Sequence, residues 1–352
     1  MQQEREERTD VMSKKQSIAA GVALALAAAT ATAGSVNSAS LDLTLGGGLT
    51  GEYVVGSNVG ASASDSITVS DFLVEASGSV ADFLDVTAGY GALGQYSLAS
   101  TTVPGSPASP VGIGLQYGWA TLKPAAGLEL QAGMLATNIG YEVAPTYANA
   151  HIQLGTVWNY QPVYYPGIRA TYDAGTFSLY AEASKDSGGF NTSRSNPNAQ
   201  AVGISGELAG WSYAASYYNR INDMDTVDLI LSGKLSGLDV AVNLDYHLLD
   251  DAAKTAGQDD TALAVALYAS QDLGEGWSLP VRLEYLSDGT STILGGVDSA
   301  FTVTVTPTYR KGPAFVRAEV AYVSASNKVF TDDSGVAQDT KTTFAVQAGT
   351  TF

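Results

Sequence analysis

The sequence predicts an all-β protein, a transmembrane antiparallel up-and-down β-barrel of about sixteen strands. Three observations predict this fold. Apolar and polar residues alternate with a period of two through most of the chain after Ser40, short turns alternate with longer polar connections, and the N-terminus has the pattern of an export signal. A period of two places one face of each strand against apolar surroundings and the other face in water.

The export signal consists of a lysine pair at 14–15, an apolar run over 18–33 and small residues at its end. This order is typical of a cleaved secretory signal. Because the first ten residues are unusually acidic for a signal, Met12 competes with Met1 as the start. A retained N-terminal helix is the alternative interpretation. We therefore expect two regions: an N-terminal extension with signal peptide, and a transmembrane barrel, over residues 1–33 and 34–352.

The alternation is clearest at 301–310, where four threonines and an arginine share one face and apolar residues share the other. Counting such segments predicts sixteen strands, with boundaries uncertain by about two to four residues. They lie at 41–54, 66–78, 83–97, 111–123, 127–136, 163–173, 176–184, 200–207, 210–220, 226–234, 237–248, 261–272, 276–286, 300–310, 313–324 and 341–352.

The connections between these segments are short at one end and mostly long and polar at the other. A soluble β-sandwich would also alternate, but it would bury the polar faces of its strands in a dry core. A closed barrel instead leaves no unpaired strand edge in lipid. The pattern therefore predicts an outer-membrane barrel of a Gram-negative-type bacterium with both termini in the periplasm. The predicted short turns lie at 78–81, 124–126, 173–175, 208–210, 234–236, 273–275 and 311–312.

The final strand ends in Phe352, with Phe344 and Val346 on the same face. This ending resembles the signal by which outer-membrane barrels are recognised by the barrel assembly machinery. Aromatic residues recur near strand ends, Trp119 among them, and predict girdles at the two membrane interfaces. The expected surroundings are outer membrane lipids and lipopolysaccharide.

A barrel of roughly sixteen strands leaves an aqueous channel, whereas eight strands are filled by side chains. If the apolar faces contact lipid, the polar faces line this channel, and acids outnumber bases on them. Such a lumen would concentrate cations. The alternative is that many of these acids sit at the rims and are merely solvated. The predicted lumen-lining charges include Glu129, Asp239, Asp245, Arg282, Glu284, Arg317 and Glu319.

The longest connection, 137–162, is unusually aromatic for a loop in water and contains Glu142 and His151. We expect it to fold into the barrel and narrow the pore; a surface Ω-loop is the alternative. The predicted constriction comprises Glu142, His151 and Arg169.

The sequence Gly140-Tyr141-Glu142-Val143, followed by Gln161-Pro162 and then by 167–172, resembles the OmpL-like putative β-barrel porin family. The resemblance implies a porin with an inward third loop, and it carries Glu142 and Arg169 over from the family pattern. The chain departs from that pattern at 148–153, where a Ser-Arg-Ser segment is usual, and again just before Gly167. The missing arginine leaves the implied constriction more acidic.

The predicted function is therefore a water-filled diffusion channel for small hydrophilic solutes and ions, with a preference for cations, without a cofactor or metal. A homotrimer is compatible with the resemblance to sixteen-stranded porins. The main alternative is a structural or surface-binding barrel, an adhesin or anchor, with acid pairs such as Asp332-Asp333 in its loops. Enzymatic barrels need a Ser–His or Asp–His site, and only Asp245 and His247 approach that pattern. The net charge of −18 argues against nucleic acid as a partner.

Overall fold

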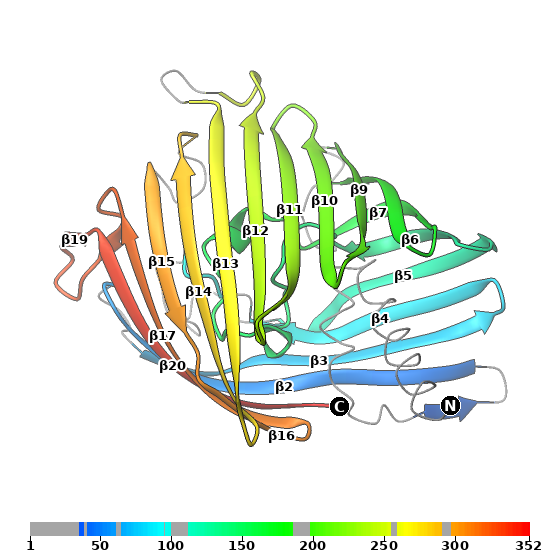
Figure 1. The fold of residues 1–352 in the computed structure, drawn as a ribbon, viewed down its shortest axis with the longest axis horizontal. Helices are drawn as coiled ribbons and strands as arrows, with labels where there is room; N and C mark the ends of the chain where they lie inside the picture. The colour runs from blue at the N-terminus through cyan, green and yellow to red at the C-terminus, as the bar shows by residue number, and fades with distance from the viewer. Residues whose placement is uncertain are drawn as a thin grey trace.

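Residues 35–38, 41–60, 65–94, 96–99, 112–185, 198–254, 259–290 and 297–352 are described by a computed structural model. Strands that alternate up and down form the wall (Figure 1). They are β2 (Leu41–Ser57), β3 (Asp65–Ala81), β4 (Leu84–Leu93), β5 (Gly114–Ala125), β6 (Leu128–Ala136), β7 (Tyr164–Asp173), β8 (Phe177–Lys185), β9 (Asn198–Leu208), β10 (Trp211–Arg220), β11 (Met224–Leu235), β12 (Leu238–Leu249), β13 (Thr261–Gly274), β14 (Trp277–Asp288), β15 (Ser299–Val305) with β16 (Thr308–Lys311), β17 (Ala314–Ala325) and β20 (Thr340–Thr351).

The wall closes into an antiparallel barrel of sixteen strands because β2 pairs with both β3 and β20. Figure 1 shows the blue β2 and the red β20 side by side at this closure. The segments β15 and β16 are two parts of one wall strand, interrupted at Thr306 and Pro307. A short strand, β1 (Ser35–Ser38), pairs with the first residues of β2, and β18 (Phe330–Thr331) pairs with β19 (Ala337–Gln338) outside the wall. The predicted fold class is confirmed.

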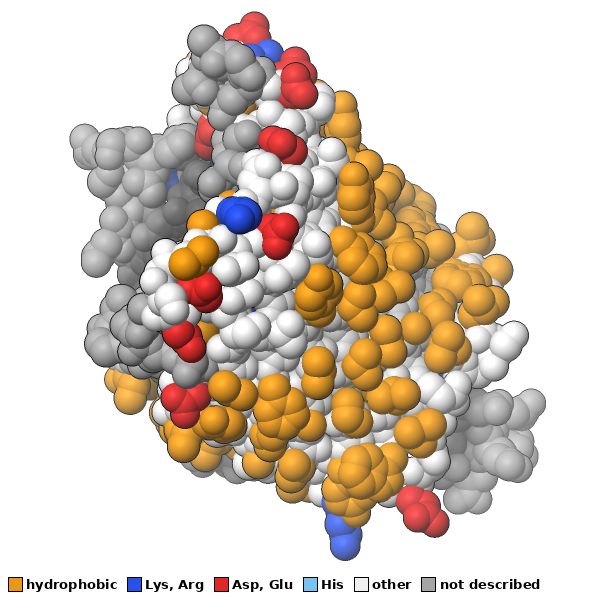
Figure 2. All heavy atoms as spheres, turned by 90° about the vertical axis from the view of Figure 1, so that its left-hand side faces the viewer, with side chains coloured by type: hydrophobic (Ala, Val, Ile, Leu, Met, Phe, Trp, Pro, Cys, Tyr) orange, Lys and Arg blue, Asp and Glu red, His pale blue; other side chains and the backbone are white. Residues whose placement is uncertain are grey.

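The apolar side chains of the wall point outward. Along β13, Leu267 is 45% exposed, whereas its neighbours Ala266 and Tyr268 are buried. Along β12, Val242 and Tyr246 are exposed and Asn243 between them is buried. A soluble protein shows the opposite arrangement. Figure 2 shows hydrophobic side chains gathered over a broad area of the side that carries β15, β17 and β20. An outward-facing apolar surface of this kind is suited to contact with lipid.

Tight turns join the strands at the end of the barrel where β2 begins and β20 ends. Residues such as Gly175 and Gly237 adopt positive φ there, as two- and three-residue hairpins require. One predicted turn is wrong: β3 continues through 78–81, and the chain turns at Asp82 and Phe83 instead. Gly78 and Ser79 continue the strand, where Ser79 is the register partner of Asp85 on β4. A Gly-Ser pair inside a strand cannot be distinguished by its sequence from one in a turn.

The outward aromatic residues form two sets near the two ends of the strands. Tyr172 and Trp277 lie near the tight turns, and Tyr246 and Tyr285 lie near the opposite end. Trp119 was predicted to join them, but its ring stacks on the inward-facing Tyr117 and lies inside the barrel. The predicted signal peptide at 1–33 lies outside the described residues.

Candidate functional site: loop L3 on the inner wall

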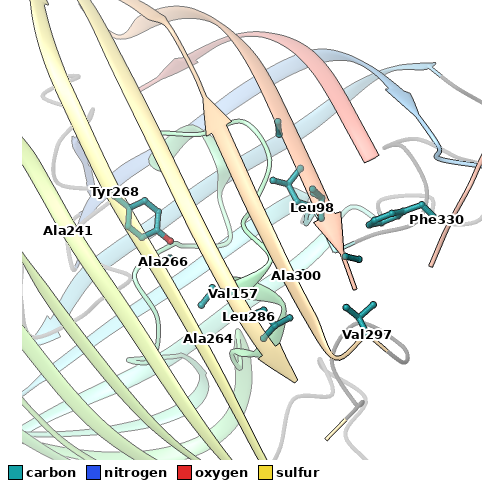
Figure 3. Packing of buried hydrophobic residues seen from close by; sticks show 13 residues of the cluster. Leu98, Val157, Ala241, Ala264, Ala266, Tyr268, Leu286, Val297, Ala300 and Phe330 are labelled. Carbon is teal, nitrogen blue, oxygen red and sulfur yellow. The ribbon is translucent and has the colours of Figure 1, made fainter. Parts of the chain in front are cut away.

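The segment joining β6 and β7, which we call loop L3 (residues 137–163), bonds to the inner face of strands on the opposite side of the barrel. It contains two short 3₁₀ turns, η1 (Thr146–Ala148) and η2 (Val157–Tyr160). Its hydrogen-bond partners belong to β3, β12, β14, β15, β17 and β20. Figure 3 shows Val157 of loop L3 beside Leu286 and Ala264 of the wall.

Carboxylates of the wall accept backbone N–H groups of loop L3. Glu319 on β17 accepts from Ile152 at 2.6 Å and from Gln153 at 3.0 Å. Glu284 on β14 accepts from Val157 at 2.9 Å, and Asp71 on β3 accepts from Thr146 at 2.9 Å. Charge-assisted bonds of this kind are stronger than neutral ones. The wall therefore satisfies backbone donors that a buried loop would otherwise leave unpaired.

Arg282 lies at the centre of this interface and is fully buried. Its guanidinium pairs with Glu142 of loop L3, contacts Glu284 at 3.1 Å and donates to the carbonyl of Gln153 at 3.0 Å. The second oxygen of Glu142 accepts the N–H of Gly155 at 2.6 Å. A buried arginine is tolerated where carboxylates and carbonyls occupy its donors in this way.

Arg317 on β17 also binds loop L3, but through neutral groups. It donates to the carbonyls of Thr146 and Asn149 at 2.8 and 2.7 Å, and to the side chain of Gln347 at 2.9 and 2.6 Å. Glu319, two residues along the same face, uses its oxygens on loop L3 instead. The arginines of the wall thus donate hydrogen bonds to carbonyls of the loop, while the carboxylates of the wall accept hydrogen bonds from its N–H groups.

His151 of loop L3 is 2% exposed and shares a hydrogen bond of 2.7 Å between its Nδ1 and the hydroxyl of Thr306. The gap between β15 and β16 places that threonine beneath the loop. Burial lowers the pKa of His151 well below its ordinary value of 6.5, and the positive charges of Arg282 and Arg317 lower it further. The imidazole is therefore neutral at neutral pH.

Two glycines allow loop L3 to pack this closely. A Cβ on Gly155 would lie 2.2 Å from an oxygen of Glu284 and 3.1 Å from an oxygen of Glu142. Gly140 has φ of +91°, and a Cβ there would lie 1.9 Å from the side-chain oxygen of Gln161. Gln161 in turn donates to Asn243 at 2.9 Å and to Asp245 at 2.8 Å. Gly155 therefore lets the loop backbone approach the wall, and Gly140 leaves room for Gln161, a loop side chain that bonds the wall.

The three residues predicted to form the constriction are not together. Glu142 and His151 are buried between loop L3 and the far wall. Arg169 lies on β7, where it pairs with Glu182 at 2.6 Å and donates to the carbonyl of Ala136 at 2.7 Å. Arg169 and Glu182 are direct register partners on neighbouring strands. The sequence pattern predicted which residues face inward, but it could not predict which ones share a contact.

The predicted lumen-lining charges divide into two groups. Those beneath loop L3 are buried and bonded, namely Asp245, Arg282, Glu284, Arg317 and Glu319. Glu129 is half-buried, and Asp239 is exposed beside Lys234 at 2.5 Å, close to the tight turns. The exposed part of loop L3 is uncharged and includes Tyr141, Ala150 and Asn159.

Sequence reasoning missed an aromatic row on the inner wall. The rings of Trp119 and Tyr117 on β5 have centroids 5.5 Å apart, and Tyr164 on β7 follows at 5.0 Å. The hydroxyl of Tyr117 donates to Glu75 on β3 at 2.6 Å. Period-two counting puts Tyr117 and Trp119 on the same face as the outward-facing Ile113 and Leu115, and the register shift between Gly89 and Tyr90 reverses that face, so the sequence carried no clear signal for the row.

Over the described residues, no helix is long and apolar enough to cross a membrane. Within the same ranges, no group of three or more acidic, histidine or cysteine side chains is arranged to bind a metal ion. His247, the residue considered for an Asp–His site, shares a hydrogen bond of 2.9 Å with Thr226.

A closed sixteen-strand barrel with an apolar outer face, a polar inner face and a loop docked on its inner wall defines the porin class of membrane proteins. The chain belongs to the family described as Putative beta-barrel porin-2, OmpL-like, whose model matches residues 61–352. This confirms the resemblance noted in the sequence. A comparison with curated proteins found no significant match.

Solved outer-membrane channels share the fold at low sequence identity. OmpT of Vibrio cholerae is 12% identical, with a TM-score of 0.62 over 90% of this chain and 99% of that one. The channel DcaP of Acinetobacter baumannii is 12% identical, with a TM-score of 0.62 over 91% and 100%. OmpF of Salmonella typhi is 11% identical, with a TM-score of 0.63 over 91% and 100%. At these identities the likeness concerns the fold.

Proposed function

We propose that the protein is an outer-membrane porin that forms a water-filled diffusion channel for small hydrophilic solutes and ions. The observation that carries the proposal is the reversed polarity of a closed sixteen-strand wall, with apolar side chains outside and polar ones inside. A barrel of roughly this strand number is too wide for wall side chains alone to fill. Loop L3 then narrows the passage from one side.

We further propose that the channel prefers cations. Five carboxyl groups lie in the interface between loop L3 and the wall, against the guanidinium groups of Arg282 and Arg317. The five are Asp71, Glu142, Asp245, Glu284 and Glu319. Glu75 and Glu129 are only half-buried, and neither has an ion-pair partner among the described residues. Low-dielectric walls focus the field of such a surplus and raise the local concentration of cations.

In the proposed setting the tight turns and both termini lie in the periplasm, and the outer belt contacts outer membrane lipids and lipopolysaccharide. Insertion would use the barrel assembly machinery. A homotrimer is part of the proposal, supported by one structural neighbour, a trimer form of Vibrio cholerae OmpT.

The test is single-channel conductance of the folded mature chain in a planar bilayer under a salt gradient. Stepwise conductance with a reversal potential favouring cations is the expected result. Glu129→Gln should reduce that preference more than Glu142→Gln does, because Glu142 is already paired with Arg282. Anion preference would refute the charge assignment, and a folded barrel without conductance would favour a structural or surface-binding barrel.

A further inference from the structure

The aromatic row on the inner wall lies beside loop L3 and outside its hydrogen-bonded interface. Trp119 and Tyr117 are stacked with an angle of 27° between their planes, and Tyr117 and Tyr164 with 28°. These three rings come from β5 and β7, with β6 between them. The row therefore forms a continuous apolar strip across neighbouring strands.

A glycine on β4 and an acid on β3 fix the direction of this row. Gly89 is the register partner of both Tyr117 and Glu75. A Cβ on Gly89 would lie 2.4 Å from the ring of Tyr117, so only glycine lets the ring cross β4. The phenol then reaches Glu75 at 2.6 Å. Because Gly89 has no side chain, the ring of Tyr117 reaches Glu75, and the aromatic row ends at a carboxylate.

Glu75 and two nearby tyrosine hydroxyls can form more hydrogen bonds or ion pairs than the described residues supply. Glu75 forms no salt bridge with a lysine or arginine in the described part of the chain. The hydroxyls of Tyr147 and Tyr164 also lack a hydrogen-bond partner among the described residues. Buried hydroxyls normally have partners, so this region offers groups that its own side chains do not satisfy.

Part of the aromatic row, together with Glu75, is accessible from the lumen. Tyr117 is buried, but Trp119, Tyr164 and Glu75 are only half-buried. Tyr164 also lines a small pocket between the two ends of loop L3, together with Trp158 and Glu142. A solute that passes loop L3 on this side therefore meets aromatic faces and a carboxylate in succession.

We propose that Trp119, Tyr117, Tyr164 and Glu75 form a subsite for organic cations that carry an apolar or aromatic group. This inference rests on the proposed pore function and names a solute class for it. Aromatic faces attract cations and also contact apolar groups, while Glu75 supplies the full negative charge. An anion is repelled by the same charge.

The test is channel block in planar bilayers. Benzyltrimethylammonium, added to one side, should interrupt the current reversibly at lower concentration than tetramethylammonium, which has no ring, or benzenesulfonate, which is an anion. Trp119→Leu should weaken the block by about 2- to 30-fold, the range that cation–π contacts support, and Glu75→Gln should weaken it by removing the negative charge. Trp119→Phe, which keeps a smaller ring, should weaken it less.

Two matched controls isolate the subsite. Glu129→Gln removes another half-buried inner acid, and Tyr172→Leu removes an aromatic ring that faces outward and is 51% exposed. Tyr172→Leu should be blocked like the unaltered protein. Glu129→Gln lowers the negative field of the lumen and should therefore weaken block by benzyltrimethylammonium and by tetramethylammonium by the same factor, whereas Trp119→Leu should weaken block by benzyltrimethylammonium alone. The subsite is overturned if Trp119→Leu and Glu75→Gln also block like the unaltered protein, or if benzenesulfonate blocks equally well.

The proposed function and the subsite fail in distinguishable ways. Normal conductance without selective block removes the subsite and leaves the pore. If the folded barrel does not conduct, the subsite is measured by quenching of tryptophan fluorescence with benzyltrimethylammonium in detergent. A quench that disappears in Trp119→Phe would support the subsite, and an unchanged titration would refute it.

Discussion

Removing the charge of Arg282 should release loop L3 from the wall. In Arg282→Met, the carboxylates of Glu142 and Glu284 keep their burial but lose their counter-charge. Breaking a buried pair from one side costs about 3–5 kcal/mol. The same change removes the bond to the carbonyl of Gln153, which is 3.0 Å long. At about 1.4 kcal/mol per tenfold, the equilibrium for local opening should shift by roughly two to almost four orders of magnitude.

Hydrogen exchange of loop L3 measures this opening directly, because the amides of Gly155 and Val157 donate to Glu142 and Glu284. Their protection should fall in Arg282→Met while the amides of β12 and β13 stay protected. The double variant Glu142→Gln, Arg282→Met should recover part of the lost protection, because it removes one of the two carboxylates left without a counter-charge. Equal protection in the single variant and the unaltered protein would refute the view that this ion cluster holds loop L3.

Three further outcomes follow from the same structure. Gly155→Ala should undock loop L3 and cost about 1–3 kcal/mol by overpacking, measured by the same exchange experiment, whereas Gly114→Ala meets nothing within 4 Å and should be neutral. Leu267→Arg, near the middle of an outward face, should cost about 2–4 kcal/mol in unfolding from lipid, and Leu273→Arg, near a tight turn, only about 0–1. His151 has a folded pKa below its unfolded value, so its neutral form is the one that folding favours. Acid should therefore destabilise the protein below about pH 6.5, by up to about 1.4 kcal/mol per pH unit, and a thermal unfolding series should show that His151→Gln removes this part of the dependence.

The wall could be predicted from the sequence because period-two alternation is a local property. Most strands begin and end within two or three residues of the predicted limits, as for β12 at Leu238–Leu249 against the predicted 237–248. Larger errors arise where the chain leaves ideal geometry. The strand expected over 83–97 ends at Leu93, after a register shift between Gly89 and Tyr90. A bulge changes which residue faces inward and leaves no clear mark in composition.

The site was less predictable, because its bonds join residues far apart in sequence. Alternation places Arg317 and Glu319 on one face and suggests that they pair with each other. In the structure both act on loop L3 instead, at Thr146 and Ile152. Similarly, Trp119 near a strand end fits an interfacial girdle equally well until Tyr117 places it inside. Periodicity reports the face of a side chain and not its partner.

The way loop L3 is held has a consequence for selectivity. Many of the bonds from the wall go to the backbone of the loop, such as those to the N–H groups of Ile152 and Val157 and to the carbonyl of Gln153. Exposed side chains of the loop, such as those of Ala150 and Asn159, take little part in that docking. Substitutions at such positions can therefore change what passes without changing where the loop lies. Residues beneath the loop set its position. They also contribute a negative field, since five carboxyl groups, with Asp245 among them, face two guanidinium groups when all are ionised. Arg282→Met should therefore alter the conductance itself, because it moves the loop, whereas Trp119→Leu should alter only the block.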